Sequence, residues 1–274
     1  MDLNPVFSIG ILSLGAQAGY YGLLWLLGGR AERARAADGF ERVVISSILF
    51  GIAVSMAMLI SLGVGVFTHY LPNEVKNRME IYKMFNVNDL NTFLSNIQVA
   101  LERAMGVYRS YFDAAVASML AFFGAVVGTG LLPWTQSISM AIVNVAMAVL
   151  TVFGSILVSS ALYGVAAAMA VGWPALMPIG AVLLTYERTR NLGALLIAAG
   201  AVAPSVLAVG ADLLNATTRP VVLTWEYFAG GGAWALWSLA QAMVTLGMTA
   251  VVMTALTYAV SRLFDHVGAH FAIE

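Results

Sequence analysis

The chain has 274 residues, of which 61% are hydrophobic and only 10% are charged. A soluble domain carries roughly 25% charged residues, so this composition excludes an ordinary soluble protein and indicates a membrane protein. The formal net charge of −1 points to no particular partner, and the lack of cysteine excludes disulfides, iron–sulfur clusters and thiolate zinc sites. The apolar runs are long and continuous, whereas strands of a membrane barrel alternate apolar and polar residues, so helices are expected.

We therefore expect an all-α, polytopic transmembrane helical bundle that forms a single membrane domain over residues 1–274. A bilayer crossing needs about 20 apolar residues, and the runs predict about seven membrane segments, one of them a short half-helix. In chain order the predicted segments cover residues 6–28, 43–69, 111–131, 137–171, 175–186, 192–213 and 232–261.

The first segment, residues 6–28, is long enough to span a bilayer and lacks the basic start of a cleavable signal peptide. Arg30, Arg33 and Arg35 follow it at once, in a predicted loop over residues 30–42. Because Lys and Arg gather on the cytoplasmic side of membrane proteins, this loop is expected inside the cell. The prediction is a multi-pass protein of the cell membrane with its N-terminus outside and its C-terminus inside.

After the second segment, residues 72–109 form the one sizeable stretch that is not predicted to lie in the membrane, and we expect it outside the cell. Its apolar residues recur at steps of three and four, which predicts an amphipathic helix with a cap near Asn88 and with Asn96 exposed. The helix either packs on the bilayer or the bundle, or forms a subunit interface or a lid over a central cavity. The apolar face available to such an interface consists of Leu90, Leu94, Ile97 and Leu101.

Residues 174–214 hold a short apolar run, then a charged island at residues 187–191, then a second apolar run. A run of about 10–14 apolar residues is too short for an ordinary crossing, which predicts a half-helix over residues 175–186. The expected breaks are at Pro174, Pro178, Gly180 and Pro204.

The charged island carries Arg188 and Arg190, which this topology places at a cytoplasmic mouth beside the arginines of the loop 30–42. Phosphate groups attract arginine, so contact with DNA or with an ATPase is one interpretation of this basic mouth. The alternative is that the arginines only set the membrane topology.

The residue patterns of common catalytic sites are missing from the sequence, including the zinc-protease, phosphate-loop and serine-hydrolase motifs. We expect no enzyme activity, no cofactor and no metal site. His266 and His270, with Asp265 beside them, have a spacing that puts both imidazoles on one helix face, but a solvated tail is the favoured interpretation.

A resemblance adds to this interpretation of the residues. The run Pro178-Ile179-Gly180, followed by Arg188-Thr189-Arg190 and by Leu192-Gly193 ahead of a long apolar helix with a proline, covers about 40 residues with its flanks. It resembles a pattern in archaeal polytopic membrane proteins of the CedA family, which form the membrane channel component of a crenarchaeal DNA-exchange system. It is also similar to the polytopic inner-membrane subunit of type IV secretion machines. Thr185-Tyr186-Glu187 departs from the pattern, which has an arginine and an aromatic residue there.

The resemblance implies a membrane channel component of a machine for DNA import or conjugation-like transfer, with DNA as the cargo. It further implies a ring-shaped homo-oligomer, small pilin-like membrane proteins as partners, and a separate hexameric VirB4/HerA-like ATPase. Two alternatives stay open. A small-solute transporter or permease would need a polar site in a discontinuous helix near mid-membrane. A non-conducting scaffold of an envelope machine would need neither a site nor a passage.

Overall fold

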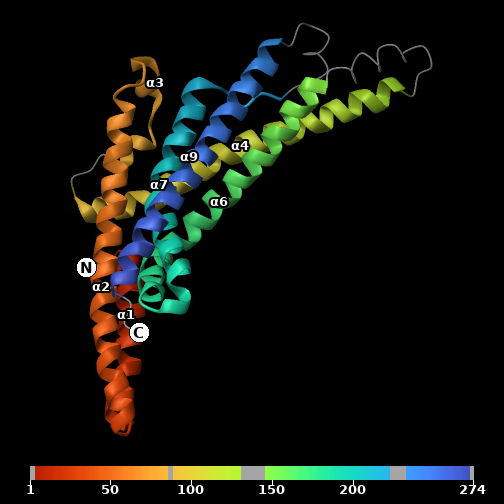
Figure 1. The fold of residues 1–274 in the computed structure, drawn as a ribbon. Helices are drawn as coiled ribbons and strands as arrows, with labels where there is room; N and C mark the ends of the chain where they lie inside the picture. Colours follow the sequence, from red (N-terminus) through yellow and green to blue (C-terminus); the bar gives the residue numbers. More distant parts are fainter. Residues whose placement is uncertain (1–3, 86–88, 131–145, 223–232, 272–274) are drawn as a thin grey trace.

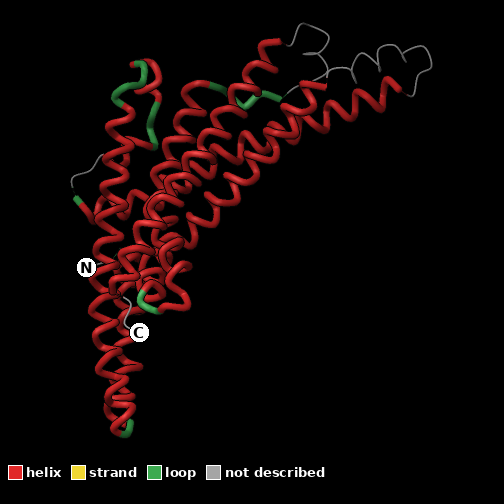
Figure 2. The backbone as a smooth tube through the Cα atoms, viewed as in Figure 1, coloured by secondary structure: helices red, strands yellow, loops and turns green. Residues whose placement is uncertain are grey.

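The structure is a computed structural model, and it describes residues 4–85, 89–130, 146–222 and 233–271. Across those ranges the regular structure is entirely helical, as Figure 2 shows. In chain order the elements are α1 (Pro5–Leu27), α2 (Arg30–Thr68), α3 (Asn73–Arg78), the 3₁₀ turn η1 (Tyr82–Phe85), α4 (Leu90–Gly130), α6 (Ala146–Leu184), the 3₁₀ turn η3 (Glu187–Thr189), α7 (Arg190–Thr217) and α9 (Ala233–Phe271).

The expected all-α fold is confirmed in the described chain, and five of its segments are long and apolar enough to cross a membrane, against the seven that the sequence predicted. They lie at Pro5–Leu27, Arg30–Thr68, Thr151–Leu184, Glu187–Thr217 and Trp237–His270. The fourth of these contains α7 and forms the centre of the bundle, because 78% of the residues in its 18-residue apolar stretch are buried. Helices α2, α4, α6 and α9 all pack against α7 (Figure 1).

The amphipathic segment and the predicted crossing at 111–131 are one continuous helix, α4, which corrects their separation in the prediction. The sequence has no proline between residues 90 and 130, so no missing amide breaks the helix after the amphipathic stretch. In Figure 1, α4 runs toward the end of the bundle where α7 finishes. The loop expected at residues 132–136, and the residues of the fourth crossing before 146, lie outside the described residues.

The apolar face of α4 is buried inside the chain itself. Leu94, Ile97 and Leu101 are each at most 2% exposed in the main core, and Leu90 is half-buried beside them. This placement matches the bundle-packing alternative, because Leu94, Ile97 and Leu101 are covered by the chain's own helices. The prediction that Asn96 is exposed is wrong, because it is half-buried and its Nδ2 donates to the Met84 carbonyl at 2.8 Å.

The cap of α4 is Asp89, whose Oδ2 accepts from the Thr92 amide at 2.9 Å and from the Thr92 hydroxyl at 2.8 Å. These bonds to the ionised carboxylate hold the pKa of Asp89 below its usual value. The expected cap near Asn88 is therefore found at the next residue.

The half-helix predicted over residues 175–186 is also corrected. Helix α6 continues through Pro174, Pro178 and Gly180 to Leu184, so no separate short helix exists there. Helix α7 likewise continues through Pro204.

The continuity of α7 has a specific cause. A proline inside a helix leaves the carbonyl four residues earlier without its amide donor. For Pro204 that carbonyl belongs to Gly200, and the indole Nε1 of Trp173 on α6 donates to it at 2.8 Å. The side chain of a neighbouring helix thus replaces the missing bond, as membrane helices allow.

The predicted loop at residues 30–42 is helical, because it forms the first turns of α2. Helix α2 runs back along α1, with the Gly39 backbone of α2 against the Tyr21 ring and the Gly10 backbone of α1 against the Phe50 ring. The α1–α2 hairpin projects beyond the other helices in Figure 1. Its tip combines exposed apolar side chains of α1 with exposed arginines of α2.

Candidate functional site

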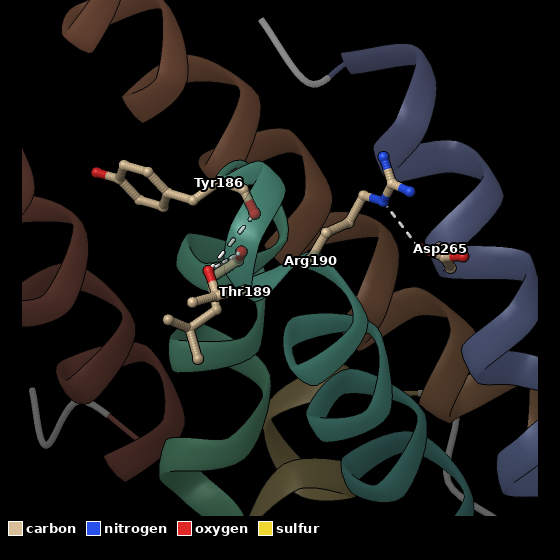
Figure 3. Close-up of polar contacts among 5 residues, drawn as sticks. Tyr186, Thr189, Arg190 and Asp265 are labelled. Atoms are coloured by element: carbon tan, nitrogen blue, oxygen red, sulfur yellow. Dashed lines mark hydrogen bonds and ion pairs between the residues drawn. The ribbon is translucent and has the colours of Figure 1, made fainter. Parts of the chain in front are cut away.

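The site that the sequence singles out is the charged turn, which we define as residues 185–190 between α6 and α7. The Thr189 hydroxyl donates to the Leu183 carbonyl at 2.8 Å, and the Thr189 amide donates to the Tyr186 carbonyl at 3.1 Å (Figure 3). The first bond adds a second donor to a carbonyl in the last turn of α6, which also accepts from the Tyr186 amide at 3.3 Å, and the second bond closes the turn beyond α6. The turn is therefore a compact, hydrogen-bonded cap and not a flexible loop.

Two glycines allow α6 and α7 to return so closely on each other. A Cβ added to Gly193 would lie 2.5 Å from the Leu184 nitrogen and 2.7 Å from the Gly180 oxygen. A Cβ added to Gly180 would lie 2.9 Å from the Gly193 oxygen. The helices thus meet backbone to backbone, the close approach that small residues permit in membranes. Both glycines belong to the run that carries the family resemblance.

Arg190 is held by α9. Its Nε donates to Oδ1 of Asp265 at 2.8 Å, and the two side chains are only 28% and 26% exposed. Figure 3 shows Arg190 and Asp265 reaching toward each other across the α7–α9 contact. Arg190 therefore ties α7 to α9, and its predicted contact with DNA or an ATPase stays a prediction.

Arg188 differs from Arg190, because it is exposed and forms no ion pair with any residue that the structure describes. Tyr186 points away from Arg190, toward α1 and α2 (Figure 3). The turn therefore has two sides, one locked to α9 by charge and one facing the N-terminal hairpin.

On the hairpin side, Tyr186 joins a polar cluster that sequence reasoning missed. Its hydroxyl lies 2.9 Å from the Tyr21 hydroxyl and accepts from Gln17 Nε2 at 3.2 Å. The guanidinium of Arg42 lies over the Tyr186 ring, 5.2 Å from its centroid, at a cation–π distance. No signal in the sequence links Tyr186 with residues of α1 and α2, because the contact depends on how the hairpin packs.

The three arginines predicted beside the turn lie further away, on the projecting hairpin. Because α2 rises about 1.5 Å per residue, Arg35 and Arg30 lie about 10 Å and 18 Å along the helix from Arg42. Arg30, Arg33 and Arg35 are all exposed. The structure thus places Arg188 and Arg190 on the charged turn and Arg42 over its Tyr186 ring, and it places Arg30, Arg33 and Arg35 further along the hairpin.

Among the described residues, no group of three or more histidine, cysteine or carboxylate side chains is placed to hold a metal ion. The rings of His266 and His270 contact each other with centroids 5.1 Å apart, and the neighbouring Asp265 is engaged by Arg190.

Comparisons with protein families, with curated proteins and with solved structures found no match to this chain.

Proposed function

We propose that the chain is the membrane channel component of a DNA import or transfer machine and works with a separate ATPase. The observation that carries this proposal is the distribution of charge. The apolar lengths of the five long apolar helices contain no charged residue; they are residues 5–27 of α1, 43–68 of α2, 146–184 of α6, 191–211 of α7 and 233–261 of α9. The charged side chains of these helices, arginines among them, lie toward the helix ends. A polyanion binds wherever arginine or lysine lines its path, so a path with charge only at its mouths lets DNA pass without holding it.

The passage in this proposal runs between copies of the chain. The centre of each bundle is filled, because α7 is buried among its neighbours. The exposed apolar surfaces lie on the outer helices, for example at Leu12 (74% exposed) on α1, Val66 (58%) on α2 and Val251 (67%) on α9. Such faces contact either lipid or another copy, which supports a ring-shaped homo-oligomer in the membrane.

The transporter alternative has less support than the sequence suggested. A midplane site in a transporter uses unwound backbone, whose free carbonyls and amides bind the solute. Helices α6 and α7 are continuous through their prolines, and Trp173 already occupies the carbonyl that Pro204 leaves free. The scaffold alternative has no observation that favours it and is separated from the proposal by experiment.

Arg188 is the residue to test, because it is exposed at the charged turn while Arg190 is engaged. In cells whose only copy of the gene carries Arg188→Gln, we expect less transfer of a selectable DNA marker at unchanged membrane abundance. The matched control is Arg109→Gln, which removes an exposed arginine from α4, away from the charged turn. Normal transfer with Arg188→Gln would contradict the contact.

A second measurement separates the channel from a scaffold. A photo-crosslinking residue at position 188 should capture DNA in cells that are transferring it, and the same residue at position 109 should capture less. A scaffold supports transfer without touching the cargo, so transfer that depends on the gene without any DNA crosslink would contradict the proposed role.

A further inference from the structure

A polar cavity of about 840 Å³ lies at the end of the bundle opposite the charged turn. Its lining residues come from α3 and the residues after it, from the middle of α4, and from the last turns of α7 and the residues after them. Three arginines from three different segments line it, together with uncharged polar side chains; these residues are Arg78, Arg103, Arg219, Asn77, Asn215 and Ser110. We call this cavity the arginine cleft.

The walls of the arginine cleft are fixed by buried hydrogen bonds. Asp212, which is 1% exposed, accepts from the backbone amides of Glu80 at 3.2 Å and Ile81 at 3.0 Å. Tyr108 and Tyr111 on α4 donate to the α7 carbonyls of Leu207 at 2.7 Å and of Leu214 at 3.1 Å. The segment after α3 and the middle of α4 are thus both bonded to α7, so the cleft is formed before any ligand arrives.

The charge in the cleft favours an anion. Two acidic residues line it beside the three arginines, and one of them, Asp212, already binds two backbone amides. Arg103 and Arg219 form no ion pair within the part of the chain that the structure describes. Arginine's planar fork of donors matches phosphate oxygens, and such charge-assisted bonds are about twice as strong as neutral ones.

The position of the cleft along α7 indicates which phosphate-bearing molecule can reach it. Helix α7 has 28 residues, and at about 1.5 Å per residue it is about 42 Å long. A bilayer with its headgroups is about 40–45 Å thick, so the two ends of α7 fall at the two headgroup layers. The cleft surrounds one of these ends, because Asp212 and Asn215 belong to the last turns of α7 and Arg219 follows directly.

We propose that the arginine cleft binds the headgroup of an anionic phospholipid, with Arg78, Arg103 and Arg219 around the phosphate. The exposed carboxylate of Glu80 at the cleft is suited to accept a hydrogen bond from a headgroup hydroxyl. The same carboxylate repels the repeated phosphates of a nucleic acid strand, which favours the lipid as occupant. This site is independent of the proposed DNA passage, because it needs only the bilayer.

The test uses the purified full-length protein and dihexanoyl phosphatidylglycerol as the probe. Native mass spectrometry counts the probe molecules bound to each protein. We expect Arg103→Gln with Arg219→Gln to weaken binding at least about tenfold, because two charged hydrogen-bond donors are removed. The matched control is Arg109→Gln, which lies on the same helix as Arg103 but outside the cleft, and which should bind as the native chain does.

A second probe, a ten-residue single-stranded oligothymidylate, distinguishes the lipid from a nucleic acid. Equal retention of the lipid by the native chain and the double variant would overturn the proposal. Tighter binding of the oligonucleotide than of the lipid by the native chain, with the oligonucleotide binding lost in the double variant, would also overturn it, since the cleft would then be a nucleic-acid site. If the double variant aggregates, Arg219→Gln alone serves, because Arg219 lies beyond the end of α7, and unchanged lipid binding would again count against the site.

Discussion

The close contact between Gly180 and Gly193 predicts that alanine destabilises the bundle at Gly193. The same substitution at Gly172, where the added methyl group meets no atom, should not destabilise it. In Gly193→Ala the new methyl group would lie 2.5 Å from the Leu184 nitrogen, 2.7 Å from the Gly180 oxygen and 2.9 Å from the Leu183 carbonyl carbon. All three are backbone atoms, so no side chain can rotate away. Ordinary contact at about 3.5 Å therefore requires α6 and α7 to separate by about 1 Å.

Overpacking of this kind costs about 1–3 kcal/mol, while alanine gains about 1 kcal/mol over glycine in a helix. Because the neighbouring backbone atoms cannot move aside, we take the upper end of the overpacking cost. The free energy of unfolding then falls by about 2 kcal/mol, which lowers Tm by about 4–8 °C in a chain of this size. Gly172→Ala on α6 is the matched control, because nothing lies within 4 Å of its added Cβ. The control should keep Tm or raise it by about 2–4 °C.

The assay is thermal unfolding of the detergent-purified chain, followed by tryptophan fluorescence and by loss of the monodisperse peak in gel filtration. A Tm for Gly193→Ala equal to that of the native chain, or to that of Gly172→Ala, would show that α6 and α7 do not meet at these glycines. A fall in Tm for both variants would mean that general loss of glycine flexibility, and not the close approach, explains the effect.

Further predictions concern the bonds that join the helices and the orientation of the bundle. Trp173→Phe keeps an aromatic ring but leaves the buried Gly200 carbonyl of α7 without its donor, so thermal unfolding should show that the free energy of unfolding falls by about 1–3 kcal/mol. A double-mutant cycle with Arg190→Gln and Asp265→Asn should give a coupling of about 1 kcal/mol, and additive effects would contradict the ion pair. The chain has no cysteine, so an added Cys at Asn215 should react with an impermeant reagent in intact cells while one at Arg33 does not. The reverse pattern would invert the predicted topology.

The amino-acid sequence by itself determined the class of the protein, because helix type and membrane character follow from local composition and periodicity. The apolar repeat at Leu94, Ile97 and Leu101 predicted one face of a helix, and that face is buried. Charge-free runs predicted long apolar helices, and five segments meet that description in the described chain. These features need only neighbours along the chain, which a sequence displays directly.

Only the tertiary structure decided where helices continue and which charges are free. Pro204 signals a break until the indole of Trp173, on another helix, supplies the missing donor. Arg188 and Arg190 are alike in sequence, yet among the residues that the structure describes only Arg190 pairs with a carboxylate, that of Asp265 on α9. A hydrogen-bond or ion-pair partner in a folded helical bundle is chosen by helix packing, which joins residues far apart in the chain, so no local pattern specifies it.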